Sequence, residues 1–204
     1  IAFGYNAETA VNNYFQQESE ISGNETQRLA LAEFQVMVEI LRANGIHVIV
    51  VKDNPYPHTP DSIFPNNWIS FHLNNHVILY PMFAENRRLE RRMDILLEIE
   101  SQLGRKFLYI DYSINELSDI FLEGTGSIVP DRKNRIAYAG ISPRIDRNLF
   151  LKFCAEQDFR PVYFHATQTV DGVQLPIYHT NVMMCVADKY AVICLNTIQD
   201  DSES

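Results

Sequence analysis

With 204 residues, 46% of them hydrophobic and 21% charged, the chain has an ordinary globular composition, which excludes a disordered or fibrous chain and predicts one domain over residues 1–204. Its net charge of −9 argues against a polyanionic partner, so no nucleic-acid binding is expected. Its apolar runs are too short to span a bilayer, so no membrane partner is expected either.

The first predicted elements are a helix and a strand. Apolar residues spaced mostly three and four positions apart predict a helix over 26–43, which Gly45 ends. The β-branched run 46–51 then predicts a strand. Further along, two apolar arms around a polar turn at Asn74 and Asn75 predict a β-hairpin.

The rest of the chain repeats these elements. Two more hairpins are predicted, and a helix and a strand follow each of the first two hairpins. In chain order the ranges are hairpin arms 68–72 and 76–80, helix 88–103, strand 107–110, arms 127–129 and 135–139, helix 146–157, strand 161–164, and arms 181–186 and 190–195.

The hairpin turns, marked by Asn74, Lys133 and Asp188, recur about every 55 to 60 residues, which indicates a repeated supersecondary unit. The chain then has the order αβ, ββαβ, ββαβ, ββ. One such unit cannot bury both faces of its sheet, so several are expected to pack into a ring or layer with the helices outside. An ordinary doubly wound α/β fold is the alternative, but it predicts single strands between helices instead of hairpins.

Three cysteines, Cys154, Cys185 and Cys194, are spaced unlike a metal site or a disulfide framework. Cys185 and Cys194 lie in apolar runs, so they are expected to be buried as small hydrophobic groups. An odd, low count is typical of a reducing compartment, which predicts a cytoplasmic protein. The chain starts at Ile1 without a methionine and ends at Ser204 directly after a strand-like run, so truncation is expected.

A polar residue stands just before the first strand of each hairpin: Asp61, Glu123 and His179. If the units are related by rotation, these three side chains converge on one central pocket. Carboxylates can accept parallel hydrogen bonds from a planar cationic group, and an oriented histidine can move protons near neutral pH. Asp61 could instead cap a turn after Pro60, and Glu123 could be a solvated strand end. Residues 124–126 form a bare Gly-Thr-Gly, a weak phosphate-binding sign.

At these residues the chain resembles the guanidino-group-modifying, or pentein, superfamily, and in particular its arginine deiminase-related, citrulline-utilisation hydrolase branch. The resemblance extends over nearly the whole chain. The motifs that carry it are residues 3–9, 61–68, 86–88, 122–127, 142–144 and 178–184.

The resemblance implies a five-bladed α/β propeller of ββαβ units, incomplete here at the C-terminal end. It implies that a cysteine thiolate attacks the central carbon of a guanidino or ureido group, and that water hydrolyses a covalent thiouronium-type intermediate. The implied partner is a free amino acid, citrulline or an arginine derivative, with no metal or organic cofactor. The exposed strand edges of an open propeller also favour association, so a homo-oligomer is one expected outcome.

The same resemblance assigns roles to residues. Asp61 and Glu123 would hold the substrate nitrogens, Glu123 would also orient His179, and His179 would be the general acid and base. Asn67 stands in the same motif as Asp61 and is expected to bind substrate. Arg144, and Arg88 or Arg87, are expected to bind the substrate carboxylate. The amide of Asn181 is also expected to bind substrate.

Two departures from the family pattern matter. Asn181 replaces an aspartate found in several deiminases, which favours a neutral ureido substrate because an amide cannot neutralise a guanidinium. None of the three cysteines stands in the glycine-rich segment where the family has its nucleophile, so this chain alone is expected to be inactive. An amidinotransferase is the nearest alternative. A binding-only pentein, such as the ribosome-associated translation initiation factor, is disfavoured by the acidic charge.

Overall fold

The computed structural model describes residues 3–16, 20–54 and 56–198. The helices are α1 (Ala7–Ala10), α2 (Gly23–Ala43), α3 (Glu85–Arg88), α4 (Met93–Leu103), α5 (Gly124–Ser127) and α6 (Arg147–Glu156). The strands are β1 (Ile69–Phe71), β2 (His76–Leu79), β3 (Leu108–Asp111), β4 (Val129–Asp131), β5 (Ile136–Gly140), β6 (Arg160–Phe164), β7 (Thr167–Val170), β8 (Val173–Pro176), β9 (Met184–Val186) and β10 (Ala191–Ile193). Short 3₁₀ turns are η1 (Pro65–Asn67), η2 (Leu73–Asn75), η3 (Ser113–Ser118), η4 (Thr180–Val182) and η5 (Leu195–Thr197).

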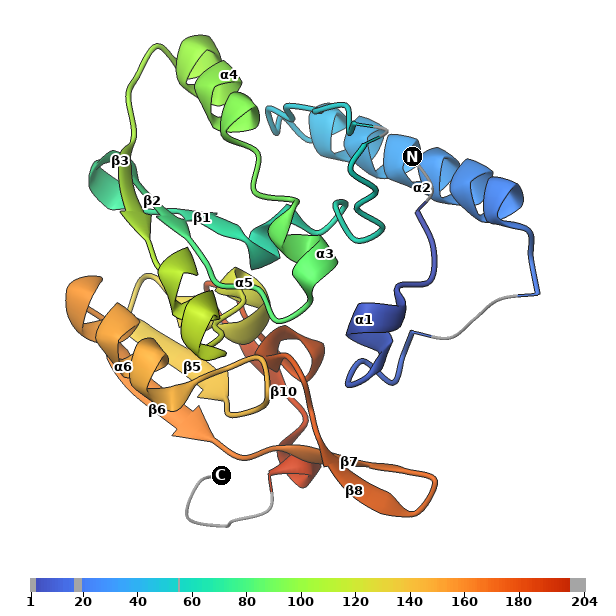
Figure 1. Ribbon diagram of the computed structural model, residues 1–204. Coiled ribbons are helices and arrows are strands. Elements are labelled where there is room, and N and C mark those ends of the chain that lie inside the picture. Colours follow the sequence, from blue (N-terminus) through green and yellow to red (C-terminus); the bar gives the residue numbers. More distant parts are fainter. Residues whose placement is uncertain (1–2, 17–19, 55, 199–204) are drawn as a thin grey trace.

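The described chain is a mixed α/β fold with two complete ββαβ units (Figure 1). In the first, β1 and β2 form an antiparallel hairpin and β3, after α4, lies parallel to β2. In the second, β4 and β5 pair in the same way and β6, after α6, lies parallel to β5. The third hairpin, β9 and β10, is antiparallel. The predicted hairpins and their repetition are confirmed.

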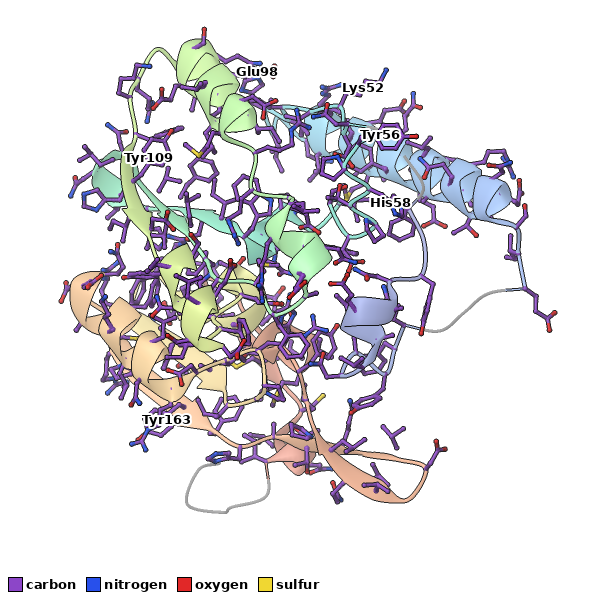
Figure 2. The ribbon with its side chains drawn as sticks, viewed as in Figure 1. Lys52, Tyr56, His58, Glu98, Tyr109 and Tyr163 are labelled. Atoms are coloured by element: carbon purple, nitrogen blue, oxygen red, sulfur yellow. The ribbon has the colours of Figure 1, made fainter. Side chains whose placement is uncertain are left out.

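Equivalent parts of the units occupy equivalent places. Tyr109 on β3 and Tyr163 on β6 are each on the third strand of a unit, at the same flank of the molecule (Figure 2). Lys133 and Asp188, in the turns of the second and third hairpins, form a surface ion pair of 2.8 Å. The second and third units are therefore neighbours in space as well as in sequence.

Each complete unit contributes to the core through its helix. Phe150 and Phe153 of α6 are fully buried against β5 and β2, in a cluster that includes Ile78 and Ala137. Leu96 of α4 is buried in a second cluster with Val77 and Trp68. The two apolar faces of the central strand β2 thus serve both units, because Val77 and Ile78 point to opposite sides of it.

The predicted helix over 88–103 is wrong at its start. The chain forms α3, then a break, and α4 begins only at Met93, after Arg92 in an extended conformation. Arg87 and Glu90 form a buried ion pair with i,i+3 spacing, while Leu89 between them is half exposed. Such a pair is compatible with a helix, so the break lies at the extended Arg92 and not at the pair.

The segment 46–51 is not a strand, so that prediction is wrong as well. β3 and β6 are ordered by parallel pairing with the second strand of the hairpin that precedes them. The segment 46–51 follows α2, and no hairpin among the described residues precedes α2. Its β-branched residues therefore have strand propensity without the pairing that makes a strand.

Two further features depart from expectation. Cys185 and Cys194 are exposed, contrary to prediction, because β9 and β10 form a two-stranded sheet with only one face covered, the face of Met184. An unpredicted hairpin, β7 and β8, precedes the third unit, and it turns at Asp171 and Gly172, both with positive φ. Asp-Gly is a strong hairpin signal that the sequence did contain.

Among residues 3–16, 20–54 and 56–198, no helix has the length and apolar character needed to cross a membrane. The same residues include no group of three or more His, Cys, Asp or Glu side chains arranged to hold a metal ion.

Candidate active site

His179 and Glu123 form the centre of the candidate site. Each residue directly precedes a one-turn element, η4 and α5 respectively, and both side chains are buried, with 4% and 0% of their surface exposed. His179 Nε2 lies 2.6 Å from Glu123 Oε2, and Glu123 Oε1 accepts a hydrogen bond of 2.9 Å from the backbone N–H of Phe83. Both carboxylate oxygens are therefore engaged.

The charges of this pair follow from their surroundings. Burial alone raises the pKa of Glu123, but the hydrogen bond from His179 and the nearby charges of Arg144 and Arg87 outweigh it and bring the pKa to about 2. Burial lowers the pKa of His179, and Glu123 opposes this only in part. Glu123 is thus ionised and His179 neutral near neutral pH. Because an ionised carboxylate can only accept, the neutral imidazole donates from Nε2–H to Glu123, which leaves the Nδ1 lone pair to take a proton.

The glycines of α5 make room for this arrangement. A Cβ on Gly126 would lie 2.5 Å from Asn67 Oδ1 and 2.8 Å from His179 Nδ1. Gly124 has φ +45°, and a Cβ there would lie 2.2 Å from the carbonyl oxygen of Asn66. Close packing of α5 against η1 and η4, rather than phosphate binding, accounts for this Gly-Thr-Gly. It also places the buried Asn67 beside His179.

Asp61 is buried and surrounded by donors from the N-terminal segment. Its Oδ2 accepts from Asn6 Nδ2 at 2.8 Å, and its Oδ1 accepts from Gln16 Nε2 at 3.4 Å. Thr9 Oγ1 lies 3.1 Å from Oδ2 and 2.7 Å from Gln16 Oε1, and its one hydrogen can go to either. These residues lie in and beside α1, which Asn6 caps by accepting from the N–H of Glu8. The Asx cap of α1 thereby aims the other end of the Asn6 amide at Asp61.

Arg144 connects the N-terminal segment with Glu123. Its Nη1 lies 3.4 Å from Glu123 Oε2, its Nε donates to Asn12 Oδ1 at 2.7 Å, and its Nη2 donates to the carbonyl oxygen of Thr9 at 2.7 Å. The guanidinium also lies over the Tyr178 ring, 4.8 Å from its centroid. Only 1% of Arg144 is exposed, so this charge is fully enclosed by partners.

The two adjacent arginines of α3 are held differently. Arg87 is buried and forms a two-point ion pair with Glu90, at 2.9 Å from both Nε and Nη2, and its Nε lies 3.9 Å from Asp61 Oδ2. Arg88 is partly exposed and donates from Nε to the carbonyl oxygen of Met82 at 3.0 Å. Arg87 therefore belongs to the buried network, and Arg88 lies at its edge.

The structure brings together most of the residues expected from the sequence. Asp61, Glu123, His179, Arg144 and Arg87 are joined by the contacts above, and Thr9 bridges Asp61 and Arg144.

Asn181 and His58 differ from that group. Asn181 is exposed, and the hydrogen bonds of the described residues do not bring it into this network. His58, which is close to Asp61 in sequence, is also exposed and lies on the segment that follows α2 (Figure 2).

Sequence reasoning missed the polar residues that complete the network. They are Asn6, Thr9, Asn12, Gln16 and Glu90. For Asn6, Thr9, Asn12 and Gln16 the available signal was the density of uncharged polar side chains in a short segment before the first long helix. That pattern alone also fits an ordinary helix cap, so it could not have placed these residues at the site.

Comparison with known protein families shows the family to which the chain belongs. The sequence model of the family described as "N,N dimethylarginine dimethylhydrolase, eukaryotic" matches residues 1–204. The chain belongs to this family. It is therefore a member of the guanidino-modifying pentein superfamily, as the sequence motifs indicated.

Solved structures share the fold at low sequence identity. One is a substrate-bound mutant of the N-terminal domain of ArgZ, an arginine dihydrolase of cyanobacteria. It is 19% identical to this chain with a TM-score of 0.68, over 99% of this chain and 67% of that one. Unliganded AgrE is 19% identical with a TM-score of 0.65, over 97% and 26%. A dimethylarginine dimethylaminohydrolase adduct is 15% identical with a TM-score of 0.57, over 82% and 60%. No curated protein matches.

Proposed function

We propose that this chain forms the substrate-binding and proton-transfer part of a cysteine-dependent hydrolase that cleaves a C–N bond of a guanidino or ureido amino acid. The observation that carries the proposal is the buried His179–Glu123 pair at 2.6 Å, with a second carboxylate, Asp61, in the same network. Family membership supports hydrolysis of an arginine derivative, and the similar solved structures include arginine dihydrolases.

The chemistry assigned to each residue follows from its environment. Asp61 accepts N–H bonds from the planar guanidino or ureido group, in the two-point manner that suits a carboxylate. The cysteine thiol gives its proton to the neutral His179, and the resulting thiolate attacks the central carbon. The leaving ammonia or amine then takes this proton from His179. His179 then removes a proton from water, which attacks the thiouronium-type carbon and releases the thiolate. Glu123 holds the imidazole in place and stabilises its charged form.

The thiolate of this proposal is not one of the chain's three cysteines. Cys154 is buried, and burial raises its pKa to about 12, which keeps it protonated. Cys185 and Cys194 lie exposed on the third hairpin. We therefore expect the 204-residue chain to bind its amino acid without turnover.

We also propose that the units belong to one domain, a pentein-type α/β propeller. The repeated parallel pairing of β3 with β2 and of β6 with β5 supports this. In such a ring the segment 46–51 would be the third strand of a unit whose hairpin is not among the described residues. Pairing there would raise the amide-exchange protection of Val48 and Val50, and unchanged fast exchange in an assembled protein would argue against it. Cytoplasmic location and homo-oligomer formation stay predictions.

Calorimetric titration tests the proposed function. L-Citrulline, L-arginine and N,N-dimethylarginine are titrated into the wild-type chain and into Asp61→Asn, which removes the charge but keeps the shape. We expect at least one of the three to bind and Asp61→Asn to weaken it at least about tenfold. Asp119→Asn, an exposed residue in the left-handed region, is the matched control and should bind like wild type. Absence of binding by all three, or an unaffected Asp61→Asn variant, would contradict the proposal.

A further inference from the structure

The segment 6–16, which we call the strap, satisfies the carboxylate of Asp61 with donors. Asn6 Nδ2 and Gln16 Nε2 donate to its two oxygens. Thr9 Oγ1 lies 3.1 Å from Oδ2, and its single hydroxyl hydrogen is shared between Asp61 and the closer Gln16 Oε1, at 2.7 Å. A guanidino or ureido group would offer the same carboxylate the same kind of partner, N–H donors from a planar group. We call Asp61 and Arg144 the two poles of the site. At the Asp61 pole the strap supplies the N–H donors that the substrate would supply.

At Arg144 the strap supplies acceptors instead. Nε and Nη2 form one edge of the guanidinium, and they donate to Asn12 Oδ1 and to the carbonyl oxygen of Thr9, each at 2.7 Å. Two oxygens on one guanidinium edge are the arrangement that a carboxylate makes in a two-point ion pair. The strap thus imitates a carboxylate at this pole, with two neutral oxygens.

The burial of both poles makes these contacts exclusive. Arg144 is 1% exposed and Asp61 is 5% exposed, so neither has a free face for a ligand while the strap is in place. A buried charge cannot stay without partners, so a ligand must replace the strap contacts that it breaks. Thr9 contacts both poles, through Oγ1 at Asp61 and through its carbonyl oxygen at Arg144. A movement of Thr9 therefore changes both sets of contacts.

We propose that the strap occupies the substrate's place before a ligand binds, so that Thr9 and Asn12 determine which ligands enter. This inference rests on the proposed function. A ligand with N–H donors at one end and a carboxylate at the other replaces both sets of contacts. A ligand with only one of these groups leaves the strap anchored at the other pole, because Thr9 links the two. Moving the strap disrupts little regular structure, because its one helix, α1, has a single turn, and so the free-energy cost is small.

Substitutions at Asn12 test the competition in both directions. Asn12→Ala removes one acceptor from Arg144 and should tighten L-citrulline or L-arginine binding roughly fivefold to tenfold. Asn12→Asp offers Arg144 a charged acceptor and should weaken the same binding by about as much. Asn13→Ala, whose side chain accepts a local bond from Phe15 N–H, is the matched control and should leave affinity unchanged. Circular dichroism on each variant checks the fold.

Hydrogen exchange follows the strap itself. Saturating L-citrulline or L-arginine should speed amide exchange in residues 6–16, whereas agmatine, without a carboxylate, and L-norvaline, without a guanidino group, should not. Binding with unchanged strap exchange, or weaker binding in Asn12→Ala, overturns the strap proposal and leaves the proposed function standing. If neither wild type nor Asn12→Ala binds any of these ligands, both proposals are overturned.

Discussion

His179 Nε2 and Glu123 Oε2 lie 2.6 Å apart although the two residues are separated by 56 positions in sequence. Each comes from the start of a one-turn element, and α5 and η4 pack together so closely that glycine is needed between them. The pair is a product of the packing of two units on each other. It follows that disturbing either unit should be visible at this bond.

Glu123→Gln is expected to destabilise the protein. The amide can still accept a bond from His179, but it no longer compensates the buried charge of Arg144, 3.4 Å away. Removing one partner from a buried pair costs about 3 kcal/mol or more of unfolding free energy. Urea denaturation at pH 7 measures it, with Glu33→Gln on the exposed face of α2 as a control within about 0.5 kcal/mol of wild type. Equal stability of the two variants would show that Arg144 does not depend on Glu123.

The same carboxylate should give the protein an acid-dependent step. The folded pKa of Glu123 is about 2, below the ordinary value of 4.5, so its contribution is present above about pH 4.5 and is lost as pH falls toward 2. Glu123→Gln should remove this part of the pH dependence. Unfolding free energies measured between pH 5 and 2.5 test this, and parallel curves for wild type and variant would contradict the assignment of an ionised Glu123.

Gly126→Ala should displace His179. The added Cβ would meet Asn67 Oδ1 at 2.5 Å and His179 Nδ1 at 2.8 Å, so one of these side chains has to move. Overpacking of this kind costs about 1–3 kcal/mol. Gly23→Ala is a matched control, because a Cβ there meets no atom within 4 Å. Thermal unfolding and the imidazole NMR signals of His179 provide the readout, and unshifted signals in Gly126→Ala would refute the steric argument.

The hairpins were predictable because their signals are local. The turn at Asn74 and Asn75 has positive φ at both positions, which asparagine tolerates, and β-branched arms surround it. The proximity of Glu123 and His179, with Asp61 linked to them through Thr9 and Arg144, follows from the same repetition, because repeated units place equivalent residues near one another. Both predictions needed only short-range patterns and one assumption about symmetry.

Some errors arose where residues distant in sequence decide the structure, whereas the unpredicted hairpin of β7 and β8 did have a local signal, Asp171 and Gly172. Residues 46–51 have the right side chains for a strand but do not pair with one among the described residues. The start of the helix predicted over 88–103 was wrong because Arg92, between α3 and α4, is extended. The strap was missed because its partners are distant in sequence. Asn12 and Arg144 are 132 positions apart, and neither local sequence predicts their hydrogen bond.

Thiol labelling should separate the three cysteines. Cys185 and Cys194 are exposed and should react rapidly with iodoacetamide at pH 8 in the folded protein. Cys154 is buried with a pKa raised to about 12, so it should react only on unfolding. Mass spectrometry is expected to find two labels before and three after denaturation. Amino-acid binding should survive the first two labels, and its loss would place one of the exposed thiols at the site after all.

His72 should make the protein less stable as the pH falls from about 6.5 to 4. Its Nε2 lies 2.6 Å from Ser70 Oγ, and burial, with the charges of Arg132 and Arg135, lowers its pKa to about 4 from 6.5. Between these two values the unfolded chain binds a proton that the folded chain does not, so stability is lost as pH decreases. The loss should be on the order of 1–2 kcal/mol, because solvent partly screens this half-buried group.

His72→Asn should be less sensitive than wild type over this pH interval, since it has no proton to bind. His47→Asn, a substitution of an exposed histidine, is the control and should retain the wild-type pH profile. Denaturation at pH 7, 6, 5 and 4 distinguishes the variants. If wild type and His72→Asn lose stability equally between pH 6.5 and 4, His72 is not the group that responds, and its burial beside Ser70 carries no cost on protonation.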